Sequence, residues 1–369
     1  MDSLIEEFGI KLWVVVFGLV LAAFLGLIIR SFSRRSSDGL NRDAGLDRSA
    51  RDPRSPGHRA DAMRRHTAPV NVGPSERRRQ RRQQGTPHRP KLTMVDLAQR
   101  LSVDAEFLKA FRPAYGRISL PKKRGGYRSI VVPDEPTKKL QQRVLHRLLG
   151  RLTVHPAALG FEKGKSIADH AAVHAGSAVI VKADIIDFFN STTSKRVGDY
   201  FRRIGWDDAC SAILTRICCD EGGLPQGAPT SPRLSNLVNK GFDELLQTIA
   251  VRRGMKYSRY ADDLCFSYAD ERRKTGERIR GLLQEVRRIG RTYGYRLHGK
   301  DKSRIVRQHR RQLVCGLVIN EKPNLPRETR RRLRAIRHRM ATKGEATMSR
   351  EQLAGWTAYE KMIEAKQSA

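Results

Sequence analysis

The tetrapeptide Tyr260-Ala261-Asp262-Asp263 limits what this chain can fold into. It follows an apolar, aromatic-rich stretch and precedes a second one at residues 264–268, which predicts a strand, a tight turn and another strand with the acids at the tip. A further strand-like segment, residues 178–189, carries Asp184. Adjacent carboxylates repel one another unless a cation offsets their charge, and Mg²⁺ prefers carboxylate oxygen. The alternative for the tetrapeptide alone is a hairpin turn exposed to water.

Acids on separate strands indicate metal-dependent phosphoryl transfer. A two-metal site needs carboxylates that converge around ions about 3.5–4 Å apart. Asp184 can supply one side of such a site, and Asp262 with Asp263 the other. Between them, residues 224–236 form a loop punctuated by Pro and Gly that leads into an apolar helix. In this loop Gly227 has no side chain, so the backbone could approach a ligand closely.

In this order, the three blocks resemble motifs A, B and C of a reverse transcriptase palm. The amino-acid sequences of these blocks are similar to those of the bacterial retron reverse transcriptases. The similarity extends to the fingers hairpin, to the retron insertion before motif A and to the Val-Thr-Gly element, at residues 121–130, 155–176 and 314–320. His170 departs from the family pattern, which has Asn at this position, and Cys315 replaces Thr. Several long motifs in the correct order are more specific than any one of them.

The resemblance implies an α+β fold of the right-hand polymerase type, with fingers, palm and thumb. Helical periodicity independently predicts helices at residues 138–152, 237–251, 275–293, 327–340 and 351–365. The expected domains are a transmembrane anchor at 1–29, a disordered Arg-rich linker at 30–90, fingers and palm at 91–320, and a helical thumb at 321–369.

The family's functional residues can be carried over position by position. The resemblance implies that Asp184, Asp262 and Asp263 are catalytic and bind two Mg²⁺ ions, with Mn²⁺ as an alternative metal. Phe189 stands where the family has the ring that blocks a ribose 2′-OH; alternatively, Phe188 and Phe189 are both core aromatics. The other nucleotide-binding positions implied are Arg128, Gln226, Gly227 and Lys302. A solvated basic loop is the alternative for Lys302.

Composition agrees with a nucleic-acid partner. The formal net charge is +34, from 72 Lys and Arg against 38 Asp and Glu. Such a field attracts phosphate backbones through counterion release, although a merely soluble, highly charged surface is the alternative. The two C-terminal helices would form a small basic thumb on duplex nucleic acid. Its RNA-binding candidates are Arg330, Arg331, Arg334 and Arg337.

The N-terminal region indicates a membrane anchor. Residues 12–29 contain no charge and reach the roughly 18 residues that a membrane-spanning helix needs. A cleaved signal peptide is the alternative, but Arg30, Arg34 and Arg35 follow where a small-residue cleavage site would stand. The positive-inside rule then predicts a single-pass protein of the bacterial inner membrane with its catalytic domain in the cytoplasm.

Together these features predict a retron-type RNA-directed DNA polymerase. It would copy a cognate structured non-coding RNA, as template and primer, into a branched, RNA-linked single-stranded DNA in antiphage defence. The expected partners are this RNA, its DNA product, dNTPs, the membrane and an accessory effector protein. Two alternatives stay open: another bacterial defence or intron-like reverse transcriptase, and a catalytically silent, membrane-bound RNA-binding scaffold.

Overall fold

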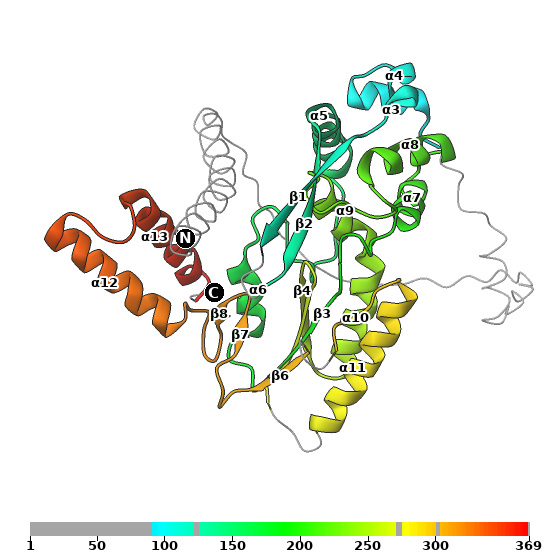
Figure 1. Ribbon diagram of the computed structural model, residues 1–369. Helices are drawn as coiled ribbons and strands as arrows, with labels where there is room; N and C mark the ends of the chain where they lie inside the picture. The colour runs from blue at the N-terminus through cyan, green and yellow to red at the C-terminus, as the bar shows by residue number, and fades with distance from the viewer. Residues whose placement is uncertain (1–90, 122–124, 271–274, 300–302, 368–369) are drawn as a thin grey trace, which may run out of the picture. The chain divides into compact units, whose positions relative to one another are not determined.

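A four-stranded antiparallel sheet forms the centre of the structure (Figure 1). The computed structural model describes residues 91–121, 125–270, 275–299 and 303–367. The anchor and the linker expected at residues 1–90 therefore lie outside the described residues. In the order β4-β5-β3-β6, the strands are β4 (Lys256–Tyr260), β5 (Asp263–Tyr268), β3 (Val179–Asp184) and β6 (Arg304–Arg307).

Side-chain alternation along the strands gives this sheet two different faces. Val181 and Ala183 of β3 are buried against the helices α10 (Lys240–Arg252) and α11 (Thr275–Thr292). The intervening Ile180 belongs to a separate core on the opposite face, which includes α6 (Ile167–His174). Since successive side chains of a strand point to opposite sides, Lys182 and Asp184 lie on this second face.

A helical subdomain with its own hydrophobic core precedes and interrupts the sheet. It carries an antiparallel hairpin formed by β1 (Tyr115–Pro121) and β2 (Tyr127–Pro133). Its helices are α3 (Met94–Leu101), α4 (Ala105–Ala110), α5 (Glu135–Arg143), the π-helix η1 (Val144–Leu149), α7 (Ser194–Arg203), α8 (Asp208–Cys218) and α9 (Ser231–Val238).

The C-terminal helices pack on the sheet face that carries Asp184. They are α12 (Arg327–Lys343) and α13 (Arg350–Glu364), and the short strands β7 (Leu313–Val314) and β8 (Leu317–Val318) precede them. Leu333 of α12 and Ile363 of α13 are buried in one core with Ile180 and Cys265 of the sheet. The α+β architecture expected from the sequence is thus confirmed.

Three of the predicted elements differ from the observed ones. The helix expected at 237–251 is divided at Asn239, whose side-chain amide donates to the Ser235 carbonyl at 2.8 Å and to the Tyr295 hydroxyl at 2.7 Å. The helix expected at 138–152 begins as α5 and continues as the π-helix η1. Strand β3 ends at Asp184, because the chain turns directly afterwards and Asp187 adopts a left-handed φ of +49°.

The predicted localisation needs a correction. None of the helices in the described residues combines the length and apolar composition needed to cross a membrane. The 18-residue helix α11 is long enough, but its sequence TGERIRGLLQEVRRIGRT is interrupted by charges throughout. Among the described residues the finding contradicts the predicted single-pass inner-membrane protein, and the span expected at residues 12–29 lies outside them.

Candidate active site

Three carboxylates from two distant segments meet at one end of the central sheet. The antiparallel register of β3 and β5 pairs Asp184 directly with Asp263. Asp262 occupies the turn before β5, and its carbonyl accepts the Ile185 amide at 3.0 Å. On the other side of β3, the His298 amide donates to the Asp184 carbonyl at 2.9 Å. The backbone of each acid-bearing segment is therefore held in place by its neighbours, as expected for a pre-organised site.

Repulsion among these acids is visible in the electrostatics of the site. Desolvation and the adjacent charge of Asp184 raise the pKa of Asp262 to about 6. A lysine and an imidazole lie against these acids. Lys182 lies 3.5 Å from an Asp263 carboxylate oxygen, and His298 Nε2 lies 3.2 Å from Asp184 Oδ2. A bound cation would relieve the repulsion further.

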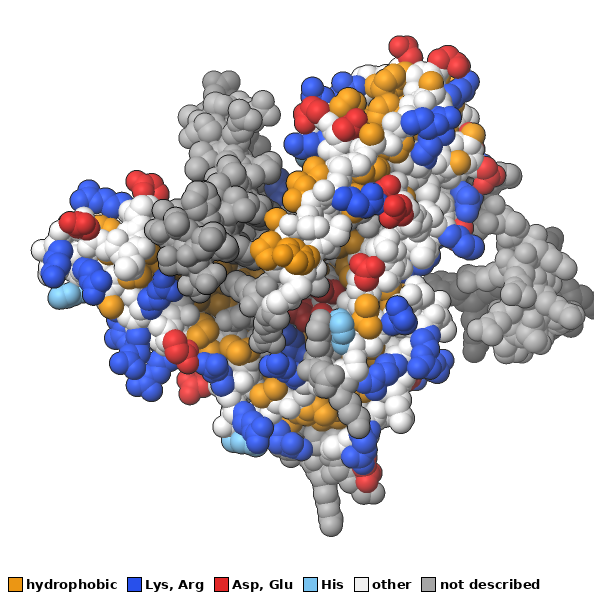
Figure 2. Space-filling view, viewed as in Figure 1, with side chains coloured by type: hydrophobic (Ala, Val, Ile, Leu, Met, Phe, Trp, Pro, Cys, Tyr) orange, Lys and Arg blue, Asp and Glu red, His pale blue; other side chains and the backbone are white. Residues whose placement is uncertain are grey.

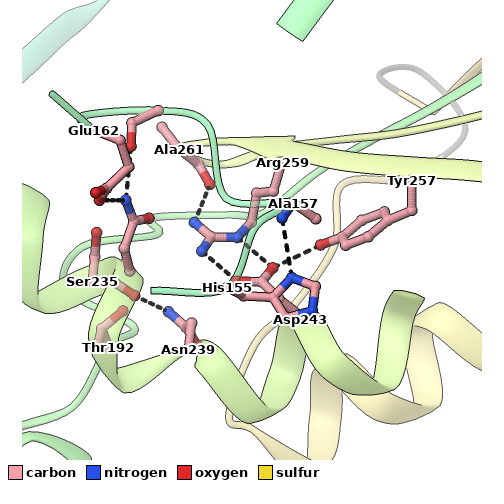
Figure 3. Close-up of polar contacts among 12 residues, drawn as sticks. His155, Ala157, Glu162, Thr192, Ser235, Asn239, Asp243, Tyr257, Arg259 and Ala261 are labelled. Atoms are coloured by element: carbon pink, nitrogen blue, oxygen red, sulfur yellow. Dashed lines mark hydrogen bonds and ion pairs between the residues drawn. The ribbon is translucent and has the colours of Figure 1, made fainter. Parts of the chain in front are cut away.

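The turn that carries Asp262 is supported by a buried ion pair that the sequence analysis missed. Arg259 and Asp243 are both fully buried and bind in bidentate fashion, at 2.8 and 2.7 Å. Figure 3 shows the Arg259 guanidinium between Asp243 of α10 and the carbonyl of Ala261, to which it donates at 3.1 Å. Tyr257 also donates to Asp243, at 2.8 Å.

The sequence did contain a signal for this pair. Asp243 lies on the apolar face of α10, with Leu246 and Ala250 at helical spacing. An acid on a core-facing stripe needs a buried partner. The same network holds Ala261 at a left-handed φ of +56°, a conformation that costs a non-glycine residue roughly 1–2 kcal/mol. The buried Arg259–Asp243 ion pair behind the turn thus maintains its sharp conformation.

The two adjacent phenylalanines after motif A lie in different environments, as expected. Phe188 is buried in the sheet core and stacks on Tyr295, with ring centroids 5.8 Å apart. Phe189 is only partly buried, and its ring lies 5.8 Å from that of Phe161. Phe188 is therefore a core aromatic, whereas Phe189 packs at the edge of the core and stays partly exposed.

The motif B loop docks on the β1–β2 hairpin. The Val131 amide donates to the Gln226 carbonyl at 2.9 Å. Gly227 has a φ of +139°, and a Cβ atom there would lie 2.5 Å from the Val131 carbonyl oxygen. Only glycine fits this position without a shift of the backbone. Arg128 is an exposed residue of β2, so the hairpin that touches the loop also carries this predicted phosphate ligand.

The predicted RNA-binding arginines on α12 do not share one environment. Lys and Arg side chains gather along α12 in the space-filling view (Figure 2). Arg330, Arg331 and Arg334 are exposed. Arg337 is half-buried instead and forms an ion pair with Glu360 of α13. Its charge is therefore partly used inside the C-terminal helix pair.

Two further expectations concern sites for nucleotide and metal. Lys302 lies outside the described residues. In the ranges that are described, no cluster of three or more His, Cys, Asp or Glu side chains has the geometry of a ready metal site. Among the described residues, Lys182 contacts Asp263 and His298 contacts Asp184 at this end of the sheet.

His170, which departs from the family pattern, is buried beneath the acidic turn. Its Nδ1 lies 2.8 Å from the Ser258 hydroxyl, which also lies 2.7 Å from His174 Nε2. His174 Nδ1 completes the chain at 2.8 Å from the Ser267 hydroxyl. These contacts attach α6 to both β4 and β5. The position therefore retains a polar packing role with His in place of Asn.

Comparison with known proteins gives one family. The profile described as reverse transcriptase (RNA-dependent DNA polymerase) matches residues 120–319. The retron Mx162 reverse transcriptase of Myxococcus xanthus is 35% identical over 272 residues, 65% of this chain and 56% of that protein. The retron Mx65 reverse transcriptase of the same organism is 34% identical over 302 residues, 75% of this chain and 69% of that protein. The chain thus spans just over half the length of the first relative and about two thirds of the second.

Among solved structures, a telomerase from Candida albicans in complex with a fragment of telomeric RNA matches with a TM-score of 0.42 and 11% identity. The match covers 62% of this chain and 48% of that chain.

Proposed function

Because the chain belongs to the retron reverse transcriptases, we propose that it is an RNA-directed DNA polymerase that copies a cognate structured non-coding RNA. The product would be a branched, RNA-linked single-stranded DNA, and the biological role would be defence against phage, together with an accessory effector protein. The observation that carries the polymerase assignment is the pairing of Asp184 with Asp263 beside Asp262. A scaffold that only bound RNA would have no need for three converging acids.

The acids fit divalent metal ions. Burial and the neighbouring charge of Asp184 raise the pKa of Asp262, and hard carboxylate oxygens are the ligands that Mg²⁺ prefers. We infer that Asp184, Asp262 and Asp263 hold two Mg²⁺ ions, with Mn²⁺ as a substitute. Ions held by these three acids would supply charge stabilisation at the primer hydroxyl and at the departing pyrophosphate.

The remaining residues would position the substrates. Phe189 would exclude a ribose 2′-OH, and the backbone at Gln226 and Gly227 would pack near the incoming nucleotide. Arg128, with Lys302, would contact its phosphates. The exposed arginines of α12 would neutralise the backbone of the RNA–DNA duplex. Phosphoryl transfer depends mainly on positioning and charge stabilisation, and these are the roles proposed for this set.

The test is to purify the full chain with its bound nucleic acid from the native locus. The nucleic acid is treated with RNase and then with DNase, and wild type is compared with Asp262→Asn/Asp263→Asn. Asp187→Asn is the matched control, because Asp187 is an exposed acid three positions after Asp184 whose side chain contacts Asn190. We expect a short DNA covalently attached to RNA in wild type and control, and its absence from the double variant.

Other outcomes would change the functional assignment of this chain. Unbranched DNA that depends on the acids would indicate another class of bacterial reverse transcriptase. RNA without DNA in every preparation would favour a non-catalytic scaffold and would overturn the proposed polymerase activity.

A further inference from the structure

Phe161 is a bulky aromatic residue, and neither its backbone conformation nor its position follows from the residues next to it in the sequence. Its φ is +65°, in the left-handed region that a large side chain rarely adopts, and the residue is 40% exposed. Strained backbone persists where the surroundings force it, and such positions are concentrated at functional sites.

The segment around Phe161 is held on one side by α9, the helix that follows the motif B loop. The Asn236 side chain donates to the Gly160 carbonyl at 2.7 Å and to Glu162 Oε1 at 2.8 Å. Glu162 also forms an ion pair with Arg233 of the same helix. Both neighbours of Phe161 are thus bound by α9 through side chains that are largely buried.

On its other side, the segment presses against the acidic turn. A Cβ atom on Gly160 would lie 2.8 Å from the Ala261 amide nitrogen, so only glycine allows this approach. One residue earlier, the Leu159 amide donates to the Arg259 carbonyl at 2.9 Å. The backbone of residues 159–162 is therefore clamped between α9 and strand β4, and the strain at Phe161 follows from this clamp.

The clamped ring contacts the predicted gate residue. Its centroid lies 5.8 Å from the ring of Phe189 and 6.3 Å from that of Tyr260. Phe189 has a second ring neighbour, the buried Phe188, at 5.5 Å. Its backbone carbonyl accepts the Leu224 amide at 3.2 Å, which attaches the gate to the start of the motif B loop. Phe189 is thus in contact with the buried ring of Phe188 and with the partly exposed ring of Phe161.

We propose that Phe161 is a positioning residue whose ring holds the Phe189 ring in place and thereby sets the discrimination between deoxyribonucleotides and ribonucleotides. The inference rests on the proposed polymerase function and adds a determinant of its sugar selectivity. A gate excludes a 2′-OH only if its ring cannot turn aside, and an aromatic neighbour on the exposed side restricts that rotation.

The experiment is single-nucleotide incorporation on an RNA template with a DNA primer, using dCTP and CTP separately, with Mg²⁺ and the full chain. The ratio of kcat/KM for dCTP to that for CTP is measured in wild type, Phe161→Ala, Phe161→Gly and Phe161→Tyr. Glycine suits the left-handed φ, so Phe161→Gly removes the ring while relieving the backbone. Phe107→Ala is the matched control, because Phe107 of α4 is 47% exposed and its ring contacts that of Phe111, the residue that follows the helix.

We expect the ratio to fall about 2- to 10-fold in Phe161→Ala and Phe161→Gly, the range for loss of one aromatic pair. The change should come mainly from a lower KM for CTP. Phe161→Tyr and Phe107→Ala should keep the wild-type ratio.

Equal losses for both nucleotides, or an unchanged ratio, would mean a structural role only and would overturn the proposal. If Phe161→Ala does not fold, the kcat/KM ratio of Phe161→Gly tests the proposal in its place. Failure of wild type to incorporate dCTP would instead refute the proposed function itself.

Discussion

Arg259 and Asp243 have no access to solvent, yet they lie directly behind the turn that presents Asp262. The Arg259 guanidinium neutralises Asp243 and also donates to the Ala261 carbonyl. Removing either charge alone would leave the other buried without compensation. The pair therefore couples the stability of the sheet to the geometry of the acidic turn.

Asp243→Ala tests this coupling. We expect a loss of roughly 3–5 kcal/mol in the free energy of unfolding, because Arg259 would remain buried without a partner. Tyr257 would also lose the acceptor of its hydroxyl proton. Urea unfolding measures the effect. Glu328→Ala is the control, since its pair with Arg311 is exposed on both sides and should matter far less. Equal changes in the two variants would contradict this account.

Among the elements, α12 combines two roles on different faces. Leu333 and Ile336 are buried on its inner face, and Arg337 pairs with Glu360 of α13. Arg330 and Arg334 are exposed. The helix thus packs through one stripe and offers positive charge on another, which suits a contact with phosphates outside the protein.

For this helix we expect a change in salt dependence. In Arg330→Gln/Arg331→Gln/Arg334→Gln, the slope of log K against log salt for RNA binding should become shallower by up to about 3, roughly one for each lost phosphate contact. Filter binding at several salt concentrations measures it. Arg280→Gln/Arg288→Gln/Arg291→Gln is the charge-matched control, because these exposed arginines lie on α11, which packs on the opposite sheet face. Identical slopes for the two triple variants would exclude a specific role of α12.

At the scale of the whole molecule, buried histidines connect α6 to the central sheet and make folding sensitive to acid. Burial lowers the pKa of His170 to about 3, and its Nε2 has no hydrogen-bond partner among the described residues. Burial also holds the pKa of His174 well below its usual value. The unfolded chain binds protons at these histidines below about pH 6.5, whereas the folded chain does not. Their contribution to stability is complete above that pH and is lost progressively as the pH falls toward 3.

His170→Leu should therefore flatten the acid dependence. Between pH 7.5 and 5.0 we expect wild type to lose about 2 kcal/mol more free energy of unfolding than the variant. Asp262 acts in the opposite direction, because its raised pKa favours the folded state as the pH falls from about 6 to 4. Its effect is present in both proteins and cancels in the difference. The exposed His309→Leu is the control, and urea titrations at the two pH values measure all three proteins.

Elements set by neighbouring residues could be predicted from the sequence. The strand, turn and strand around Asp262 follow from local propensity, and α11 and α12 begin at the predicted residues and end within three residues of the predicted ends. Strand alternation predicted the separation of Phe188 from Phe189, although both residues lie in the turn that follows β3 and not on the strand. Asn239 could not be identified as a helix break, since its partner Tyr295 lies far along the chain.

The sequence by itself determined the acids, their order, the basic character of the chain and the periodicity of its helices, because each depends on residue type and local spacing. Only the tertiary structure decided that Asp184 lies opposite Asp263 and that Phe161 lies against Phe189. It also decided that Asp243 neutralises Arg259 behind the turn. These contacts join segments far apart in the chain, and their energies depend on register and burial, which exist only once the whole sheet and its helices have packed together.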